Sequence, residues 1–378
     1  MRRVDGLEGM RGYLSLWVWI THVTTMASLA FDKHRGWGWL LANGDTAVGT
    51  FIIISGFVIA LNVDRSYHGY GGYIVRRALR LFPVYLACLV ISVVVLNYSI
   101  DVLKDIPWPG PRTADRIRYL TDSRDYFWQH LVLHSLLLHG LVSDALLPST
   151  SLAFIGQAWS LTLEWQFYLV APPLFFLAQR MRLSLAPVAC TMAGLLLLAL
   201  YFRQSSFLLS SLYLFFVGCV SYRLHCSLHA PTPEQLPVPS RQRAVWLLGV
   251  LAVMSLSRFS MGFGPVLWAA LFYSLFLSEG PVHRAVTWML TNRLATWLGA
   301  ISYPFYCVHM IVLILLAGLL VHGFRIESQA WFATLLIVTS LPMSLASAWL
   351  LHRFIENPMI NLGRVLVKRR SPRPVPST

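Results

Sequence analysis

Stretches of about twenty apolar residues recur along nearly the whole chain, from residue 12 to residue 351, with only short polar interruptions. The chain has 378 residues, of which 56% are hydrophobic and 12% are charged. A soluble chain carries roughly 25% charged residues to cover its surface. The recurring apolar runs therefore predict an all-α polytopic membrane bundle, with no soluble domain of ordinary size between its helices.

Apolar windows of membrane-spanning length predict about ten transmembrane helices. The windows are residues 12–31, 44–63, 78–98, 161–179, 184–202, 207–224, 243–259, 262–279, 298–321 and 330–352. Residues 126–142 (YFWQHLVLHSLLLHGLV) are also apolar, but this stretch is short and contains three histidines. We interpret it as an interfacial or re-entrant element. If it spans the membrane, the topology changes.

Basic residues predict the orientation, because cytoplasmic loops are enriched in lysine and arginine. With the N-terminus inside, 20 of the 30 basic residues fall on the cytoplasmic side, and five of the others lie in the one long loop, 99–160. Both termini are therefore predicted to be cytoplasmic. The formal net charge of +14 is then mostly topological, and we expect no nucleic-acid partner. Loop 99–160 is a candidate lid.

Two domain-level segments follow from this pattern. Residues 1–364 are expected to form the transmembrane domain, and residues 365–378 a basic, proline-rich cytoplasmic tail that lies against anionic lipid headgroups. The proline-rich link 229–242 separates two groups of helices. We detect no internal repeat, which disfavours the inverted-repeat transporter folds.

Metal binding is not indicated by the histidines and cysteines. His130 and His134 are four residues apart and His139 follows, but no HExxH pattern or acidic partner accompanies them. The five cysteines lie in or at the edges of apolar segments without metal-ligand spacing. We predict no metal site, and we interpret the cysteines as small buried hydrophobic residues.

The stretch DGLEGMRGYLSLWVWITHV, residues 5–23, places Arg11 at the start of an apolar helix and His22 deep inside it. Eleven residues make three helical turns plus about 20°, so both side chains share one face, roughly 16 Å apart. Ionisable residues inside a span are costly unless they face a cavity or the bundle interior. His22 is a candidate proton acceptor, and the alternative is a neutral structural histidine.

Arg77 and Arg80, in YIVRRALRLFPVYL (73–86), lie three residues apart at the predicted cytoplasmic end of the third helix. A guanidinium offers a planar fork of donors that suits phosphate or carboxylate oxygens. This pair is a candidate phosphate site, and positive-inside anchoring explains the spacing equally well.

A third candidate group occupies QAWSLTLEWQFYLVAPPL, residues 157–174. Glu164 lies just inside the predicted helix, and Trp159, Ser160, Gln166 and Tyr168 surround it in the sequence. A buried carboxylate must be paired or protonated, so Glu164 predicts a cationic or hydroxyl partner on another helix. A site role and a structural ion pair both remain open.

The ninth and tenth predicted helices contribute two further motifs. SYPFYCVHM (302–310) contains His309, which is either a second proton group or a hydrogen-bonded structural histidine. RFIENPM (353–359) contains Glu356, which we expect to tether a cytoplasmic helix end.

Taken together, these motifs resemble those of acyltransferase family 3, which comprises polytopic membrane O-acyltransferases of surface glycans, oligosaccharides and some macrolides. The opening is similar to the family's DGLRG with an Arg-x10-His pair on Arg11 and His22. FIIISGF is similar to FFVLSGF, and RRALRLFP to R-x-x-R-x-x-P on Arg77 and Arg80. The remaining segments resemble WSLxxExQFY, SYxxYxxH and RxxExP. The matches follow the family order across residues 2–364.

The sequence departs from the family pattern at one position. Many members carry an aspartate in GVDLFF, where this chain has Gly49, and Asp45 lies one helical turn earlier. We predict that Asp45 takes over that role. The chain has no appended hydrolase-like domain, which implies the stand-alone form of the family.

The resemblance implies an O-acetyltransferase of a bacterial inner membrane that needs no bound cofactor. It implies acetyl-CoA, or another acyl-CoA, as a cytoplasmic donor and a hydroxyl of a glycan such as an exopolysaccharide, lipopolysaccharide or oligosaccharide as acceptor. His22 is then the base, Arg11 orients the donor, and Glu164 pairs with a cation or holds the acceptor. The substrate-binding residues are predicted to be Arg77, Arg80, Asp45, Trp159, Ser160, Tyr168 and His309.

Several alternatives remain open from the sequence. In the first alternative the acceptor is a macrolide or another small molecule. In the second the protein is a transporter or flippase of an amphiphilic glycan, because intramembrane Arg, His and Glu also line substrate paths. A non-catalytic scaffold leaves the stacked Arg11 and His22 unexplained. The acyl chain length, a covalent or direct transfer, and the oligomeric state are not determined by the sequence.

Overall fold

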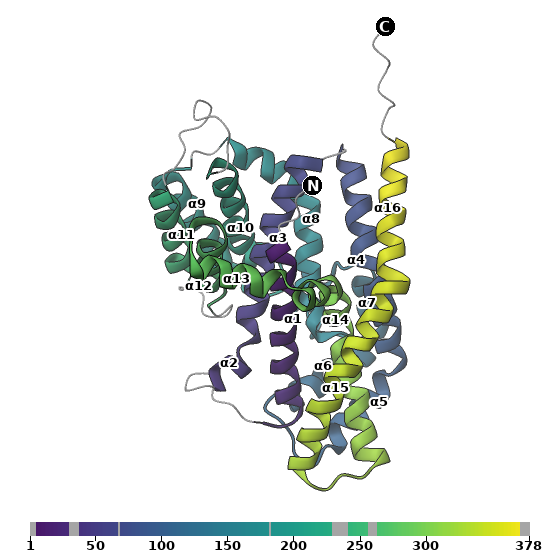
Figure 1. Ribbon diagram of the computed structural model, residues 1–378. Helices are drawn as coiled ribbons and strands as arrows, with labels where there is room; N and C mark the ends of the chain where they lie inside the picture. Colours follow the sequence, from purple (N-terminus) through teal and green to yellow (C-terminus); the bar gives the residue numbers. More distant parts are fainter. Residues whose placement is uncertain are drawn as a thin grey trace.

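The computed structural model describes residues 5–29, 38–66, 69–180, 183–228, 241–255 and 263–370, and within these ranges it is helical without strands (Figure 1). Residues 229–240 of the predicted link 229–242 and the last eight residues of the predicted tail lie outside the described residues. The all-α prediction is confirmed.

The first half of the chain forms α1 (Asp5–Met26), α2 (Gly38–Ala42), α3 (Gly44–Ser66), α4 (Gly69–Val94), α5 (Leu96–Asp105), α6 (Thr113–Asp125), α7 (Phe127–Ser135), η1 (His139–Leu141), η2 (Gly156–Ala158) and α8 (Trp159–Gln179). The second half forms α9 (Leu185–Tyr201), α10 (Leu208–Leu228), α11 (Arg241–Ser255), α12 (Gly264–Phe272), η4 (Tyr273–Leu277), α13 (Pro281–Thr291), α14 (Arg293–Gly318), η5 (Leu319–Gly323), α15 (Gln329–Leu351), η6 (His352–Glu356) and α16 (Asn357–Arg370).

Each of the ten predicted windows overlaps a helix. By length and composition, five helical stretches of the described residues are able to cross a membrane, and a sixth is added if the bent pair Gly264–Leu277 and Pro281–Thr291 counts as one span. The axes of that pair meet at 108°. Helices such as α9 are shorter than a full span, and α1 and α8 include polar residues. The positions of the helices therefore agree with the prediction, whereas fewer of them than the predicted ten have the length and composition of a full span.

Residues 126–142 do not form a spanning helix. α7 has nine residues, which gives a length of about 14 Å, and the chain then turns into the three-residue η1. Because the hydrocarbon core is about 30 Å thick, this segment is too short to cross it. The interpretation as a non-spanning element agrees with the structure.

The centre of the molecule is built from α1, α3, α8 and α14. In Figure 1, α9 to α12 lie on one side of these helices, and α4, α15 and α16 lie on the other. α1 packs along α14 and α3, and α3 also packs along α10 and α8. A single apolar core connects these helices, so side chains from sequence segments far apart meet in the middle of the bundle.

Glycines allow α1 and α14 to approach closely. A Cβ added to Gly12 would meet the backbone of Leu298 and Gly299, and one added to Gly299 would overlap the carbonyl of Glu8. Small residues at such contacts are typical of membrane helices, where close backbone approach provides the packing energy. This contact fixes the position of α1 relative to α14, and therefore the distance between the motifs that they carry.

Candidate active site

Two cavities follow each other between the central helices. The larger has a volume of about 390 Å³ and is lined by His22, so we call it the His22 cavity. The smaller has a volume of about 50 Å³ and is lined by Arg11, so we call it the Arg11 pocket. Val48 of α3 and Tyr306 of α14 line both. Arg11 and His22 therefore reach two adjoining cavities from one helix.

His22 lies near the end of α1, and not at its middle as the predicted window 12–31 implied. The helix begins at Asp5 and ends at Met26. The hydroxyl groups of Thr24 and Thr25 donate to carbonyls of the preceding turn, and Ser28 adopts a left-handed φ of 59°. These features end the helix earlier than hydropathy indicates, so His22 lies at the level of α5 and α6.

His309 lies beside His22, with ring centroids 5.3 Å apart. Its Nδ1 is 3.1 Å from the carbonyl oxygen of Phe305 and 2.9 Å from that of Tyr306. Because both partners are acceptors, Nδ1 carries the proton, and Nε2 of the neutral ring is left as an acceptor. No hydrogen-bond partner for Nε2 is present among the described residues. The motifs of α1 and α14 thus bring two imidazoles together, although His309 itself is not among the residues that line the His22 cavity.

Glu164 faces the Arg11 pocket and has hydroxyl partners. Tyr168 donates a hydrogen bond to its carboxylate, and Ser55 of α3 donates to the same oxygen over 3.3 Å. The predicted hydroxyl partner on another helix is therefore present. Arg11 lines the same pocket, with its guanidinium 6.0 Å from the centroid of Phe51.

Arg77 and Arg80 lie next to this group on α4, although neither lines the Arg11 pocket. The guanidinium of Arg77 is buried between the rings of Tyr73 and Tyr168, at 5.6 Å and 5.1 Å from their centroids. Arg80 lies on the same helix, three residues further along. Two cations from two helices therefore lie near Glu164: Arg11 of α1 lines the same pocket, and Arg77 of α4 lies over the Tyr168 ring that donates to Glu164.

Glu356 is buried within η6, and its Oε2 lies 2.6 Å from Nδ1 of His352. It therefore holds the junction between α15 and α16, and its charge reaches Arg80 on the neighbouring α4. This placement agrees with the expected role of a helix tether.

Tyr306 forms the wall between the two cavities. Its hydroxyl donates to the carbonyl oxygen of Gln157 over 2.9 Å, and Ser160 Oγ lies 2.8 Å away. Because the only Tyr306 proton is directed to Gln157, Ser160 is the donor in the second contact. The start of α8 is thus tied to α14 at the point where the cavities meet.

Asp45 and Trp159 line the His22 cavity, whereas Ser160 lines the Arg11 pocket. The residues predicted from six separate motifs therefore fall into two adjoining sets. One set surrounds Glu164 and the other surrounds His22.

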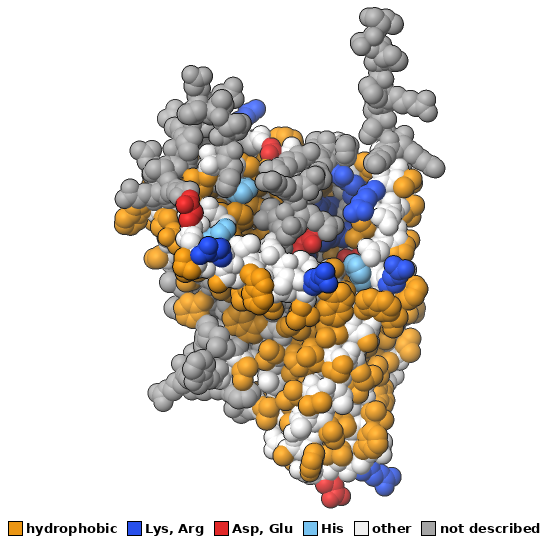
Figure 2. All heavy atoms as spheres, viewed as in Figure 1, with side chains coloured by type: hydrophobic (Ala, Val, Ile, Leu, Met, Phe, Trp, Pro, Cys, Tyr) orange, Lys and Arg blue, Asp and Glu red, His pale blue; other side chains and the backbone are white. Residues whose placement is uncertain are grey.

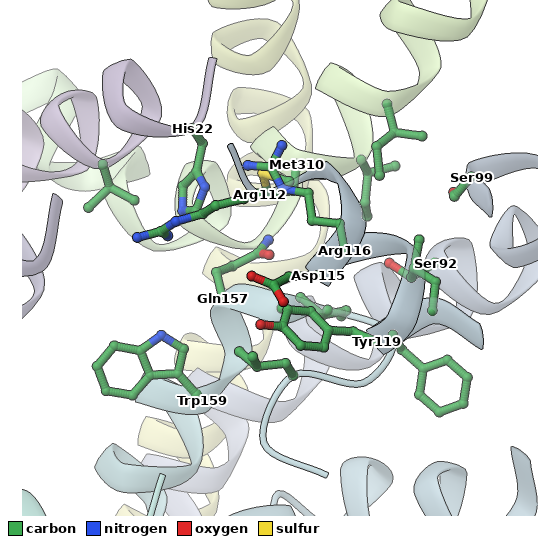
Figure 3. Close-up of a pocket in the computed structure, with 18 of the residues that line it drawn as sticks. His22, Ser92, Ser99, Arg112, Asp115, Arg116, Tyr119, Gln157, Trp159 and Met310 are labelled. Carbon is green, nitrogen blue, oxygen red and sulfur yellow. The ribbon is translucent and has the colours of Figure 1, made fainter. Parts of the chain in front are cut away.

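Residues of α6 complete the His22 cavity, and the sequence interpretation did not select them. Arg112, Asp115, Arg116 and Tyr119 line the cavity, and Figure 3 shows them around the same space as His22 and Gln157. The polar composition of α6 predicts an exposed loop segment. The spacing of four and then three residues between Arg112, Arg116 and Tyr119 was the available sequence signal, since it places them on one helix face.

The three histidines near α7 are buried but do not form a metal centre. His134 and His139 stack with ring centroids 3.9 Å apart, and Nε2 of His134 lies 3.0 Å from the carbonyl oxygen of Thr150. Burial lowers the pKa of His139 to about 3. Within the described ranges, no three His, Cys, Asp or Glu side chains are arranged as metal ligands.

Comparison with known families gives a match over most of the chain. The model described as "Acyltransferase domain", of the third acyltransferase family, matches residues 4–353. No curated protein and no solved structure matches the chain. The matched range contains both cavities and every motif discussed above except RFIENPM, of which only Arg353 falls inside it.

Proposed function

Because the chain belongs to this acyltransferase family and is an integral membrane protein, we propose that it transfers an acetyl group from cytoplasmic acetyl-CoA to a hydroxyl of a carbohydrate acceptor. The acceptor is an exopolysaccharide, lipopolysaccharide or oligosaccharide at a bacterial inner membrane. The proposal rests mainly on one observation: the Arg11 pocket and the His22 cavity adjoin at Tyr306. A donor and an acceptor that approach from opposite sides of the membrane meet at such a wall.

The donor half of the proposal uses the cations around Glu164. Arg77 and Arg80 bind the phosphates of acetyl-CoA, because their guanidinium groups offer several fixed donors to phosphate oxygens. Arg11 orients the thioester where the Arg11 pocket approaches Tyr306. Glu164 holds these cations in place, and Tyr168 and Ser55 fix the carboxylate in turn.

The acceptor half uses the His22 cavity. A hydroxyl of the sugar attacks the thioester carbon, and His22 takes its proton. A carbon–oxygen bond forms as the carbon–sulfur bond breaks, and the proton passes to the departing CoA thiolate. Asp45 and Trp159 contact the sugar from the cavity wall, and His309, which lies beside His22, binds the acceptor through its unprotonated Nε2.

His22→Ala tests this proposal. Membranes that contain the full-length chain are incubated with labelled acetyl-CoA and with glycan acceptors, and the label on the acceptor is measured. Loss of a general base costs about 100- to 10,000-fold in rate, so we expect transfer to fall by that factor. His322→Ala, at a half-exposed histidine that pairs with Asp105, is the matched control and should transfer normally.

Two outcomes would count against the proposal. Full transfer by a properly inserted His22→Ala variant would remove His22 from the chemistry. Movement of glycan across the membrane without consumption of acetyl-CoA would indicate a transporter. Comparison of glycans by mass spectrometry, with and without the protein, then identifies the acceptor by the loss of one acetyl group.

A further inference from the structure

The His22 cavity contains two arginines that the proposed acetyl transfer does not use. Arg112, the residue directly before α6, and Arg116 of α6 both line the cavity. Figure 3 shows both side chains on the His22 side of the space. α6 belongs to the loop between α4 and α8, so these cations come from outside the central helices.

Arg116 has only uncharged hydrogen-bond partners in the described part of the chain. Its Nη2 donates to Thr25 Oγ1 over 2.9 Å, and its Nη1 lies 3.7 Å from the sulfur of Met26. Burial, and then the nearby charge of Arg112, lower the pKa of Arg116 to about 10. Arg116 is half-buried, and a cation that is largely removed from water without a carboxylate is costly to maintain, which is typical of a group that awaits an anionic ligand.

The acidic residues of the cavity do not neutralise both arginines. Asp115 pairs with the exposed Arg118, with Nη2 and Oδ1 3.0 Å apart. Asp45 lies on the opposite element, in the first turn of α3. No ion pair to Arg112 or Arg116 occurs among the residues that the structure describes. The cavity lining thus holds two arginines and two aspartates, and Asp115 is paired with Arg118, which lies outside the lining.

The rest of the cavity suits a sugar. Its volume of about 390 Å³ lies in the range of roughly 300 to 1,000 Å³ that is usual for small-ligand sites. Trp159 and Tyr119 offer flat aromatic faces, and Gln157 and Thr21 offer polar groups.

We propose that Arg112 and Arg116 bind an anionic group of the acceptor, so that the preferred acceptor is an acidic glycan whose hydroxyl then lies beside His22. The proposal rests on the proposed acetyl transfer for the role of His22. A uronic acid carboxylate and a sugar phosphate are the two sources of such an anion. Their shared feature is a set of anionic oxygens that a guanidinium binds through two parallel hydrogen bonds.

The first experiment measures binding without catalysis. The full-length protein, in a neutral detergent and without acetyl-CoA, is titrated with cellobiose, with its uronic acid counterpart cellobiouronic acid, and with cellobiose phosphate. Thermophoresis or the fluorescence of the cavity tryptophan gives each dissociation constant. We expect at least one acidic sugar to bind about tenfold more tightly than cellobiose. The uronic acid and phosphate arms identify which anion is preferred.

Substitutions on α6 assign the effect to the two arginines. Arg112→Gln should lower the preference for the acidic sugar over cellobiose by about tenfold, measured as the ratio of the two dissociation constants. Arg112→Lys should retain part of this preference because the charge remains. Arg124→Gln, on the same helix but exposed and paired with Asp125, is the matched control and should bind like the unchanged protein. The side chain of Arg112 makes no hydrogen bond within the described ranges, so Arg112→Gln should leave the fold intact, whereas Arg116→Gln loses the contact to Thr25.

Three results would overturn this inference. Equal binding of neutral and acidic sugars is one, and an Arg112→Gln preference equal to that of Arg124→Gln is another. The third concerns the Arg112→Gln variant. Either a weaker apparent affinity for acetyl-CoA, or an equal loss of transfer to neutral and acidic acceptors, would contradict the inference. Binding that follows the expected pattern while no acceptor receives acetyl would instead contradict the proposed function and leave the acidic-glycan site standing.

Discussion

Arg77 is held between two aromatic rings, and this setting distinguishes it from an arginine that only anchors a helix at the membrane surface. Its guanidinium lies over Tyr73 and Tyr168, and Tyr168 donates to Glu164. The rings fix the plane of the guanidinium, so its fork of donors has a defined direction. A lysine keeps the charge but has neither the plane nor the fork.

Arg77→Lys should therefore raise the KM for acetyl-CoA by about tenfold while the protein still inserts into the membrane. The measurement is the dependence of transfer rate on acetyl-CoA concentration. Arg76→Lys, at the adjacent position and on a less buried side of α4, serves as the control. An unchanged KM in Arg77→Lys would remove Arg77 from donor binding.

At the scale of helices, the contact between α1 and α14 determines whether the two histidines meet. Gly299 leaves no space for a side chain against the carbonyl of Glu8. Gly299→Ala should push the helices apart, destabilise the protein by about 1–3 kcal/mol and lower the transfer rate. The measurements are the thermal unfolding midpoint in detergent and the transfer assay.

Gly194→Ala on α9 is the matched control for this prediction. Nothing lies within 4 Å of a Cβ at Gly194, so alanine there should be neutral or stabilise the helix by up to about 1 kcal/mol. If Gly299→Ala behaved like Gly194→Ala, the close α1–α14 contact would not set the spacing of His22 and His309.

The element formed by α7 and η1 makes stability depend on pH. Burial lowers the pKa of His139 to about 3, and burial together with His139 lowers the pKa of His134 well below its usual value. In the unfolded chain both rings titrate near pH 6.5. Between about pH 6.5 and about pH 3 the unfolded state binds more protons, so acidification destabilises the folded state in that window.

His139→Phe keeps the stacked ring and removes one of these titrations. Its unfolding midpoint should therefore fall less steeply than that of the unchanged protein as the pH is lowered from about 6.5 to about 4. Thermal unfolding in detergent at a series of pH values gives the two slopes. Equal slopes would show that His139 does not contribute to acid sensitivity.

The positions of the central helices were largely predictable from the sequence, whereas the ends of the helices and the residues near α6 that line the His22 cavity were not. Apolar windows place every central helix, yet hydropathy gives no indication that α1 starts at the polar Asp5. Pro83 and Pro304 lie inside α4 and α14, because neighbouring helices tolerate proline in a membrane bundle. α6 was missed because its polar composition indicates exposure, and only tertiary packing brings Arg112 and Arg116 to His22.

At the scale of the whole molecule, the bundle extends beyond a membrane core at one end. The helical stretch Gln329–Val367 has 39 residues, or about 58 Å, roughly twice the hydrocarbon thickness. Figure 2 shows hydrophobic side chains gathered below a row of basic and acidic ones. The later part of the stretch Gln329–Val367 belongs to α16, and α16 packs along α4, the helix that carries Arg77 and Arg80. The cations of the proposed donor site thus lie beside the part that leaves the core.

The orientation of the molecule decides which cavity faces the donor, and it is directly testable. With the N-terminus in the cytoplasm, Ala145, in the turn that follows η1, faces outward, and Glu279, in the turn before α13, faces inward. Both are exposed. In a background whose five cysteines are replaced by alanine, Ala145→Cys should react with a membrane-impermeant maleimide in intact cells. Glu279→Cys should react only after permeabilisation. The reversed pattern would place the His22 cavity on the cytoplasmic side and leave Arg77 and Arg80 without access to acetyl-CoA.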